Sequence, residues 1–435
     1  MAKIVFIGAG SHAFSRLLIT DILSFPDLRD STITLMDIAE EPLGLITSFT
    51  KKLVKQQGFN TVVQSTMDRR QALEGADYVF VTIMVGKPRT LQAYPEITSK
   101  YGIEGSHDTI GPSGIFYGLR HVPVILDICH DMEELCSDAW LLSYANPMAI
   151  ICWAVNDYTR IKNVGLCHSI PHTTVELANY FGVPKEEISS WVAGINHMAW
   201  FLKLNLCGKD AYPLLREKFK DPAVYSRPDA HWGGPDIIRA EVLKAFGYFV
   251  SEGSPHMATL IPYFKKRPEL IERFKVNDNK FEQPAARRAR EDKELKQQIN
   301  SDYVFPINRS DEYGPIIIHS IETGVPSRVC TNVKNTNLIT NLPDGCCVEV
   351  PCLVDKEGVH PCYIGDLPPQ LAGLNRTNIN VHEMAVRGIV EKDKTKIFQS
   401  LLLDPLTSAI LTIDETRQMA EELFQVSSEY LRDFN

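Results

Sequence analysis

A glycine-rich turn near the start of the chain constrains the fold most. The apolar run at residues 3–7 (KIVFI) is typical of a buried strand, and it leads through residues 8–11 (GAGS) into a helical pattern of apolar residues. Gly8 permits a tight turn, and Gly10 leaves room for a pyrophosphate to approach the backbone at the N-terminus of the helix. The spacing Gly8-x-Gly10-x-x-Ala13 therefore predicts a strand–turn–helix unit that binds a dinucleotide.

One acidic residue refines this prediction. Asp37 directly follows a second strand-like run, TITLM at residues 32–36, and lies 27 residues after Gly10. A carboxylate at this position accepts hydrogen bonds from the adenosine ribose and repels a 2′-phosphate, so NAD is favoured over NADP. We expect the cofactor to be bound by Gly8, Gly10, Ser11 and Asp37.

Strand-like and helical segments alternate through the first half of the chain. Apolar runs at 78–85 and 140–144 lie between helical patterns such as 41–58 and 122–135. Such alternation predicts an α/β fold, a Rossmann-type doubly wound parallel sheet like that of the lactate and malate dehydrogenases. We assign this domain to residues 1–197.

The pattern changes in the second half of the chain, where strand-like and helical stretches mix without regular alternation. We therefore assign residues 198–435 to an α+β domain for substrate binding and oligomerisation. A charged segment at 284–300 is expected to form a helix with mainly solvated faces, because mixed charges at helical spacing are usually exposed.

Composition excludes several classes of partner. The 435 residues carry a formal net charge of −9, which gives no electrostatic basis for binding nucleic acid or an anionic membrane. No apolar run approaches the roughly 18 residues of a membrane span. The ten cysteines lack the spacing of a disulfide framework, and the first residues lack the pattern of a signal peptide. We expect a soluble, cytoplasmic protein that acts on a small molecule.

Polar residues follow three of the strand-like runs. Cys167 and His197 could together bind one divalent ion, and a thiolate with an imidazole suits Mn, Fe, Co, Ni or Zn better than Mg. Asn146 could hydrogen-bond a sugar hydroxyl and the nicotinamide ribose. The alternative is structural: a buried thiol, a hydrogen-bonded histidine and a loop asparagine.

A series of collinear motifs spans nearly the whole chain and resembles the family 4 glycoside hydrolases, which are glycosidases dependent on NAD and a metal. The CHS and GINHMAW sequences are most similar to the α-galactosidase (melibiase) branch. The α-glucuronidase and α-galacturonidase branches share Cys-His, so uronides remain open. The matching motifs are FIGAGS at 6–11, MDI at 36–38, GSHDTIGPSGIFYGLR at 105–120, YANPMA at 144–149, GLCHS at 165–169, AGINHMAW at 193–200, RAE at 239–241, GYF at 247–249 and NLPDGCCVEV at 341–350.

The resemblance implies a role for each matching residue. It implies that Cys167 and His197 bind Mn²⁺ or another divalent ion, and that His168 acts as or assists the general acid. Glu241 falls where the family has its base, with Tyr248 as the alternative. Four further residues are implied to contact the sugar, the nicotinamide end of the cofactor or metal-bound water: Asp108, Asn146, Asn196 and Arg239.

The resemblance also implies a redox route for hydrolysis of melibiose-like α-galactosides. Hydride leaves C3 for NAD⁺, and the C3 ketone acidifies the C2 proton. The metal stabilises the resulting charge, the aglycone is eliminated, water adds at C1, and the hydride returns. The alternatives are α-glucuronidase, α-galacturonidase or α-glucosidase activity within the same family, a hydroxy-acid dehydrogenase, or an NAD-binding regulator without catalysis. A homodimer or homotetramer is expected.

Overall fold

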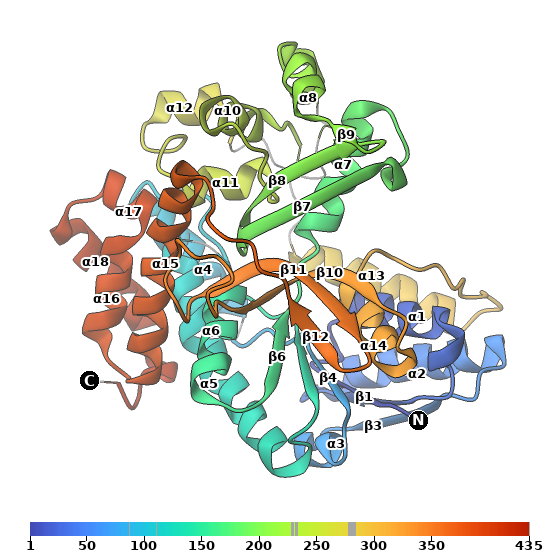
Figure 1. Cartoon of the computed structure of the whole chain (residues 1–435). Coiled ribbons are helices and arrows are strands. Elements are labelled where there is room, and N and C mark those ends of the chain that lie inside the picture. Colours follow the sequence, from blue (N-terminus) through green and yellow to red (C-terminus); the bar gives the residue numbers. More distant parts are fainter. Residues whose placement is uncertain (87, 110, 228–229, 231–233, 277–283, 435) are drawn as a thin grey trace.

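The computed structural model describes residues 1–434 apart from 87, 110, 228–229, 231–233 and 277–283 (Figure 1). Within the described residues, twelve strands form one sheet in the order β3-β2-β1-β4-β5-β6-β10-β11-β7-β8-β9, and β12 pairs with β11. The strands are β1 (Lys3–Ile7), β2 (Thr32–Met36), β3 (Val62–Thr66), β4 (Tyr78–Val81), β5 (Trp140–Ser143), β6 (Lys162–Gly165), β7 (Ile188–Ile195), β8 (Met198–Leu206), β9 (Lys209–Asp210), β10 (Ser327–Lys334), β11 (Cys347–Asp355) and β12 (Gly358–Pro361).

Strands β1 to β6 pair in parallel, which confirms the predicted Rossmann-type sheet. Strands β1, β2, β4 and β5 are almost wholly buried because helices cover both faces of the sheet, as a continuous apolar strand requires. The helices of this half are α1 (His12–Ser24), α2 (Glu40–Gln57), α3 (Arg69–Leu73), α4 (Pro88–Lys100), α5 (Gly111–Leu135), α6 (Met148–Tyr158) and α7 (Ser169–Phe181), with 3₁₀ turns at Pro26–Leu28 and Lys185–Glu187.

Two predicted elements of this half have different bounds in the structure. The strand expected at 78–85 ends at Val81, and the residues that follow it do not continue the strand. Helix α5 begins at Gly111, well before the expected start at 122. Pro112 fits the first turn of a helix, where its missing N–H would have no partner, and buried neighbours carry the helix past Pro123.

The second half extends the sheet of the first half. Strand β10 pairs antiparallel with β6, and β11 links β10 to the β7–β8 hairpin. The predicted boundary at residue 197 falls in the turn of this hairpin. The helices of this half are α8 (Tyr212–Lys218), α9 (Pro222–Tyr225), α10 (Ile237–Phe246), α11 (Ser254–Leu260), α12 (Pro268–Arg273), α13 (Pro284–Ile299), α14 (Tyr313–Thr323), α15 (Pro369–Val390), α16 (Lys394–Leu403), α17 (Pro405–Ile410) and α18 (Ile413–Val426), with a 3₁₀ turn at Ser428–Tyr430.

One hydrophobic core joins the two halves. It runs from β1 through β4 and β5 to β10, β11 and α15, and a smaller core lies between the β7–β8 hairpin and helices α7, α8 and α10. Figure 1 shows the C-terminal helices beside α4 and α5, and the β7–β8 hairpin with α8 and α10 as a separate projection above the parallel sheet.

The charged helix α13 lies against the first half rather than alone in solvent. It packs along α2, as Figure 1 also shows. Many of its charged side chains remain exposed, but Lys296 pairs with Glu41 of α2 at 2.7 Å and Asp292 pairs with His12 of α1. The expectation of a helix is confirmed, and one of its faces is an interface.

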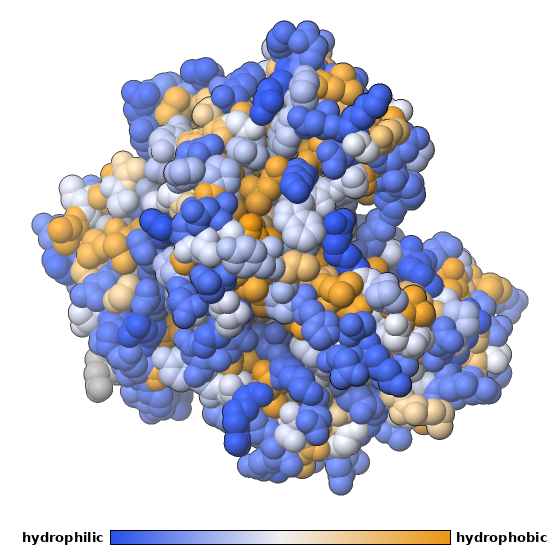
Figure 2. Space-filling model, viewed as in Figure 1, coloured by the Kyte–Doolittle hydropathy of each residue, from blue (hydrophilic) through white to orange (hydrophobic). Residues whose placement is uncertain are grey.

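The surface seen in Figure 2 is mainly hydrophilic, with apolar side chains scattered between polar ones. In the described part of the chain, no helix combines the length and apolarity that crossing a membrane requires.

Candidate functional site

The carboxyl ends of β1, β4, β5 and β6 open into a cavity of about 340 Å³. This edge of a parallel sheet is where open α/β folds bind ligands, because strand ends and helix N-termini meet there. The described residues that line it are Ser11, Phe14, Thr82, Ile83, Met84, Asp108, Thr109, Tyr144, Ala145, Asn146, Met148, Leu166, Cys167, His168, His197, Glu252 and His256.

The turn between β1 and α1 packs so closely against neighbouring residues that two of its positions admit only glycine. Gly8 has φ +86°, and a Cβ there would lie 2.8 Å from the Ile83 side chain. A Cβ on Gly10 would lie 2.7 Å from Asp37 Oδ2, the oxygen that accepts the Gly10 N–H at 2.8 Å. The turn, its acidic partner and the start of α1 thus have the arrangement of a dinucleotide site.

The N-terminus of α1 is electrostatically suited to an anion. Ser11 precedes the helix without a capping hydrogen bond from its hydroxyl, and the first turn contains no acidic residue. Ser11 also lines the cavity. The N–H groups and positive dipole end of α1 can therefore bind a phosphate.

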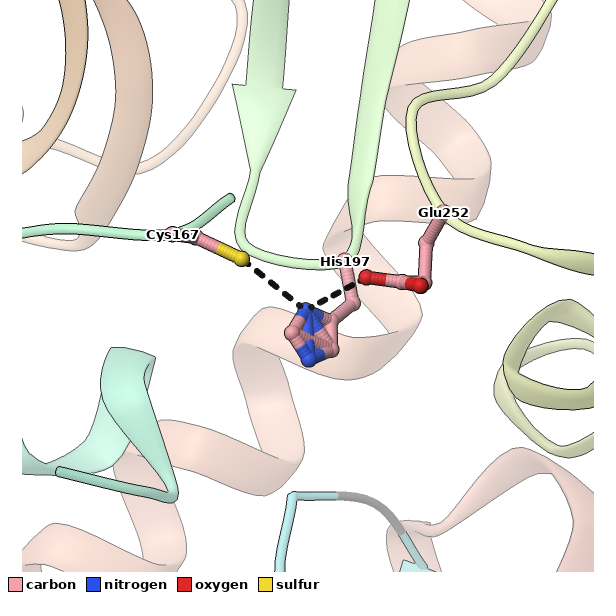
Figure 3. A group of neighbouring side chains, drawn as sticks. All are labelled: Cys167, His197 and Glu252. Carbon is pink, nitrogen blue, oxygen red and sulfur yellow. Dashed lines mark hydrogen bonds and ion pairs between the residues drawn. The ribbon is translucent and has the colours of Figure 1, made fainter. Parts of the chain in front are cut away.

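Three buried side chains form a candidate metal centre (Figure 3). Cys167 Sγ lies 3.9 Å from His197 Nδ1, which lies 3.3 Å from Glu252 Oε2. The donor atoms of all three lie within 4.8 Å of one another. Donors about 2.0–2.3 Å from one ion lie roughly 3–4 Å apart, so this spacing fits a shared divalent ion. Sulfur, imidazole and carboxylate together favour a transition metal over Mg²⁺.

The three side chains come from separate elements. Cys167 follows the end of β6, His197 occupies the turn of the β7–β8 hairpin, and Glu252 lies in the loop between α10 and α11. His197 has φ +63°, which is unfavourable for a residue with a Cβ.

Burial perturbs the protonation of this cluster. Burial raises the pKa of the Cys167 thiol well above its usual value, and the charges of Glu349 and Glu252 raise it further. Burial lowers the pKa of His197 to about 4 against the attraction of Glu252. Burial alone would raise the pKa of Glu252, but His197 and His256 outweigh it and hold this pKa well below the usual value.

A second set of polar side chains adjoins the cluster. His256 Nδ1 lies 2.9 Å from Glu252 Oε1, and the His256 ring contacts that of His107 at 4.5 Å between centroids. His107 Nδ1 lies 2.9 Å from Asp108 Oδ1. Asn146 Nδ2 donates to Asp108 Oδ2 at 3.5 Å. A series of polar and ring contacts therefore connects the metal cluster to Asn146, the residue expected to bind the sugar.

Six predicted site residues line the cavity, Ser11 of the dinucleotide turn among them, and two of the six are also members of the metal cluster. Cys167 and His197 are these two, and Asp108 and Asn146 line the same cavity. His168 also lines the cavity, with its ring 4.8 Å from that of His172.

The two predicted candidates for the base are not brought to the cavity. Glu241, on α10, is partly exposed and pairs with Lys244 at 2.9 Å. Tyr248 packs against Tyr212 beside the smaller core. Neither Glu241 nor Tyr248 is among the described residues that line the cavity. The expectation that one of them is the base therefore has no geometric support.

Arg239 and Asn196 also take up structural positions. Arg239 is fully buried, and its guanidinium binds Asp236 at 2.7 Å and Glu176 at 2.6 Å, so it has a structural role instead of the expected contact with substrate. Asn196 is buried beside Glu349, a carboxyl whose pKa burial raises to about 8.

The sequence prediction missed Glu252, His256 and His107. Glu252 and His256 stand on either side of the Gly-Ser-Pro sequence that begins α11, shortly after apolar Phe249 and Val250, a pattern that could have drawn attention to them. The sequence spacing between Glu252 and Cys167 does not predict that they lie close together, because their proximity depends on the tertiary packing of the segment between α10 and α11.

Comparison with known proteins agrees with this geometry. The family model described as family 4 glycosyl hydrolase matches residues 3–183, and that of its C-terminal domain matches residues 192–407. The α-galactosidase of Bacillus subtilis is 38% identical, with 100% of each chain covered. The α-galactosidase of Rhizobium meliloti is 35% identical over 99% of this chain and 89% of its own.

Solved structures show the same fold. A 6-phospho-α-glucosidase from gut microorganisms, solved with NAD and glucose-6-phosphate, has a TM-score of 0.84 at 20% identity, with 100% of each chain covered. A malate dehydrogenase from Plasmodium falciparum, solved with NADH, has a TM-score of 0.50 at 13% identity over 90% of this chain and 99% of its own. The two family models and the full-length relatives establish that this chain belongs to glycosyl hydrolase family 4.

Proposed function

We propose that this family 4 glycosidase is an α-galactosidase that requires NAD and a divalent metal such as Mn²⁺. The observation that carries the proposal is that the N-terminus of α1 and the Cys167–His197–Glu252 cluster open into the same cavity. A plain dehydrogenase site would not need a buried thiol beside an imidazole and a carboxylate.

The residues of the site fit both NAD and a divalent metal. Gly8, Gly10, Ser11 and Asp37 would bind the dinucleotide, and the tight turn that only glycine fits at both positions supports this assignment. Cys167, His197 and Glu252 would hold the metal. The 6-phospho-β-glucosidase of Thermotoga maritima, a neighbour at TM-score 0.79, was solved with manganese, NAD⁺ and glucose-6-phosphate. When bound, the cofactor supplies reversible hydride acceptance and the metal supplies Lewis-acid polarisation of sugar oxygens.

The chain's own side chains supply positioning and proton transfer. Asn146, bonded to Asp108, orients a sugar hydroxyl. His168 lines the cavity, and burial and His172 lower its pKa, so its neutral ring can donate an N–H toward the leaving oxygen. Glu241 and Tyr248 lie outside the cavity, so the acceptor of the C2 proton is sought among the residues that line it, of which Asp108 and His256 are two candidates.

The charge of the cavity supports a neutral sugar as substrate. Among the described residues that line it there is no Lys or Arg. None of these described side chains therefore offers a guanidinium or ammonium group to pair with a 6-phosphate or a uronate carboxylate. The full-length α-galactosidase relatives at 38% and 35% identity point the same way. An α-glucosidase at 30% and an α-galacturonidase at 28% identity define the competing activities.

The state of the cysteines bears on where the enzyme works. All ten are free thiols in the structure, and the metal cluster needs a reduced Cys167. This supports a reducing compartment, and we place the enzyme in the cytoplasm.

A substrate panel tests the proposal. The protein is assayed with NAD⁺, Mn²⁺ and dithiothreitol on the nitrophenyl α-galactoside, α-glucoside, α-galacturonide and α-glucuronide. We expect the highest kcat/KM on the α-galactoside, and activity lost when either NAD⁺ or Mn²⁺ is omitted. A preference for a uronide would assign the enzyme to that activity instead. Hydrolysis without either cofactor would refute the proposed chemistry.

A further inference from the structure

Helix α13 brings an arginine from the second half of the chain to the glycine turn of the first. Resting on the proposed function, we infer that Arg288 is a cofactor-binding residue that pairs with the pyrophosphate of the dinucleotide. Arg288 Nη2 donates to the carbonyl oxygen of Gly10 at 3.3 Å. Gly10 belongs to the glycine turn that, in a dinucleotide site, lies against the pyrophosphate.

Contacts at several points anchor α13 in this position. Asp292, one turn after Arg288, pairs with His12 in the first turn of α1. At the far end of α13, Lys52 Nζ on α2 donates to the carbonyls of Gln298 at 2.8 Å and Ile299 at 3.0 Å. The helix is therefore fixed along the edge of the dinucleotide site, where Arg288 lies next to the turn.

The charges of the helix favour an anionic ligand. Residues 284–299 contain five Arg or Lys and three Asp or Glu, which gives a formal charge of +2. Arg287 is bound within the helix, with Nε 3.0 Å from Glu291 Oε1. Arg288 has only a loose internal pair, with Nε 4.0 Å from Asp292 Oδ2.

Arg288 therefore has N–H donors available for a ligand. A guanidinium has five N–H donors in a planar fork suited to phosphate oxygens, and the contact with Gly10 occupies one of them. The side chain is 58% exposed, so it can turn toward a ligand that lies on the N-terminus of α1.

Direct binding of NAD⁺ tests the inference. Isothermal titration of the full chain with NAD⁺ compares wild type, Arg288→Gln, Arg288→Lys and the control Arg287→Gln, which removes an equally exposed arginine from the same helix. We expect Arg288→Gln to raise Kd about tenfold, Arg288→Lys to restore part of the loss, and Arg287→Gln to leave Kd within about twofold. Raising the NaCl concentration should weaken binding to wild type more than to Arg288→Gln, since one phosphate contact is missing in the variant.

The outcomes separate this inference from the proposed function. If wild type binds NAD⁺ and Arg288→Gln binds it as tightly as Arg287→Gln, the inference is overturned and the proposed function stands. If wild type does not bind NAD⁺, both are overturned. Circular dichroism of each variant confirms that the fold is retained.

Discussion

At the scale of single residues, the metal cluster depends most on Cys167. Its thiolate is the soft ligand of the set, and serine supplies only a hard, weakly acidic hydroxyl. We expect Cys167→Ser to weaken Mn²⁺ binding by about 100-fold or more and to reduce turnover in parallel. Cys207→Ser is the matched control, because Cys207 is exposed. Titration of Mn²⁺ by electron paramagnetic resonance measures the affinity; unchanged binding in Cys167→Ser would remove the cysteine from the site.

Two glutamates, one inside the metal cluster and one outside the cavity, give a second test of the site. Glu252 contacts His197 in the buried cluster, whereas Glu241 is partly exposed and paired with Lys244. We expect Glu252→Gln to weaken metal binding by about 10–100-fold, since an amide replaces a charged ligand. Glu241→Gln should keep kcat/KM within about threefold of wild type, since pairs of this kind contribute little. If instead Glu241→Gln abolished turnover with metal binding intact, Glu241 would be restored as the base.

At the scale of elements, the β1–α1 turn has no room for a side chain. A Cβ on Gly10 would lie 2.7 Å from both Asp37 Oδ2 and Pro42 Cβ. We expect Gly10→Ala to displace Asp37 and to raise the Kd for NAD⁺ about tenfold or more, with Mn²⁺ affinity unchanged. Gly44→Ala, on α2 with no atom within 4 Å of the added Cβ, is the control. Equal NAD⁺ affinity in both variants would contradict the assignment of the turn.

The sequence predicts elements well where one physical signal dominates. Apolar runs predict β1 and β2 with their observed bounds, and the glycine spacing locates the dinucleotide turn. The start of α5 is missed because Gly111 and Pro112 resemble a loop until buried packing is taken into account. Helix α13 is predicted as a helix, but its contact with α2 depends on tertiary structure.

The candidate site is predictable only in part for the same reason. Cys167 and His197 follow strand-like runs, so the sequence indicates where they lie. Glu252 lies in the loop before α11 and His256 in the first turn of α11, and the approach of both to the cluster depends on tertiary packing. The family resemblance implies Glu241 as the base, but on α10 this side chain pairs with Lys244.

At the scale of the whole molecule, the two halves share one sheet, one core and one cavity. Cys167 belongs to the first half and Glu252 to the second, so a metal that binds both links the halves in the folded state. A ligand that binds only the folded protein stabilises it by about 2.7 kcal/mol at 100 times its Kd.

Metal addition and removal should therefore change Tm. We expect Mn²⁺ to raise Tm by a few degrees, EDTA to reverse the change, and Cys167→Ser to abolish it. Differential scanning calorimetry measures the shift, with Mg²⁺ as the control ion that this donor set disfavours. An equal rise with Mg²⁺, or an undiminished rise in Cys167→Ser, would mean that the stabilising ion binds elsewhere.

The central claim is that one cavity joins a dinucleotide site to a metal site for removal of the sugar C2 proton. The most direct test is hydrolysis of nitrophenyl α-galactoside in D₂O with NAD⁺ and Mn²⁺, with the released galactose analysed by NMR. A proton held by a side chain of the cavity exchanges with solvent, so the account predicts deuterium at C2 of the product, and none in galactose merely incubated with the enzyme. Galactose that retains only hydrogen at C2 after hydrolysis would contradict it.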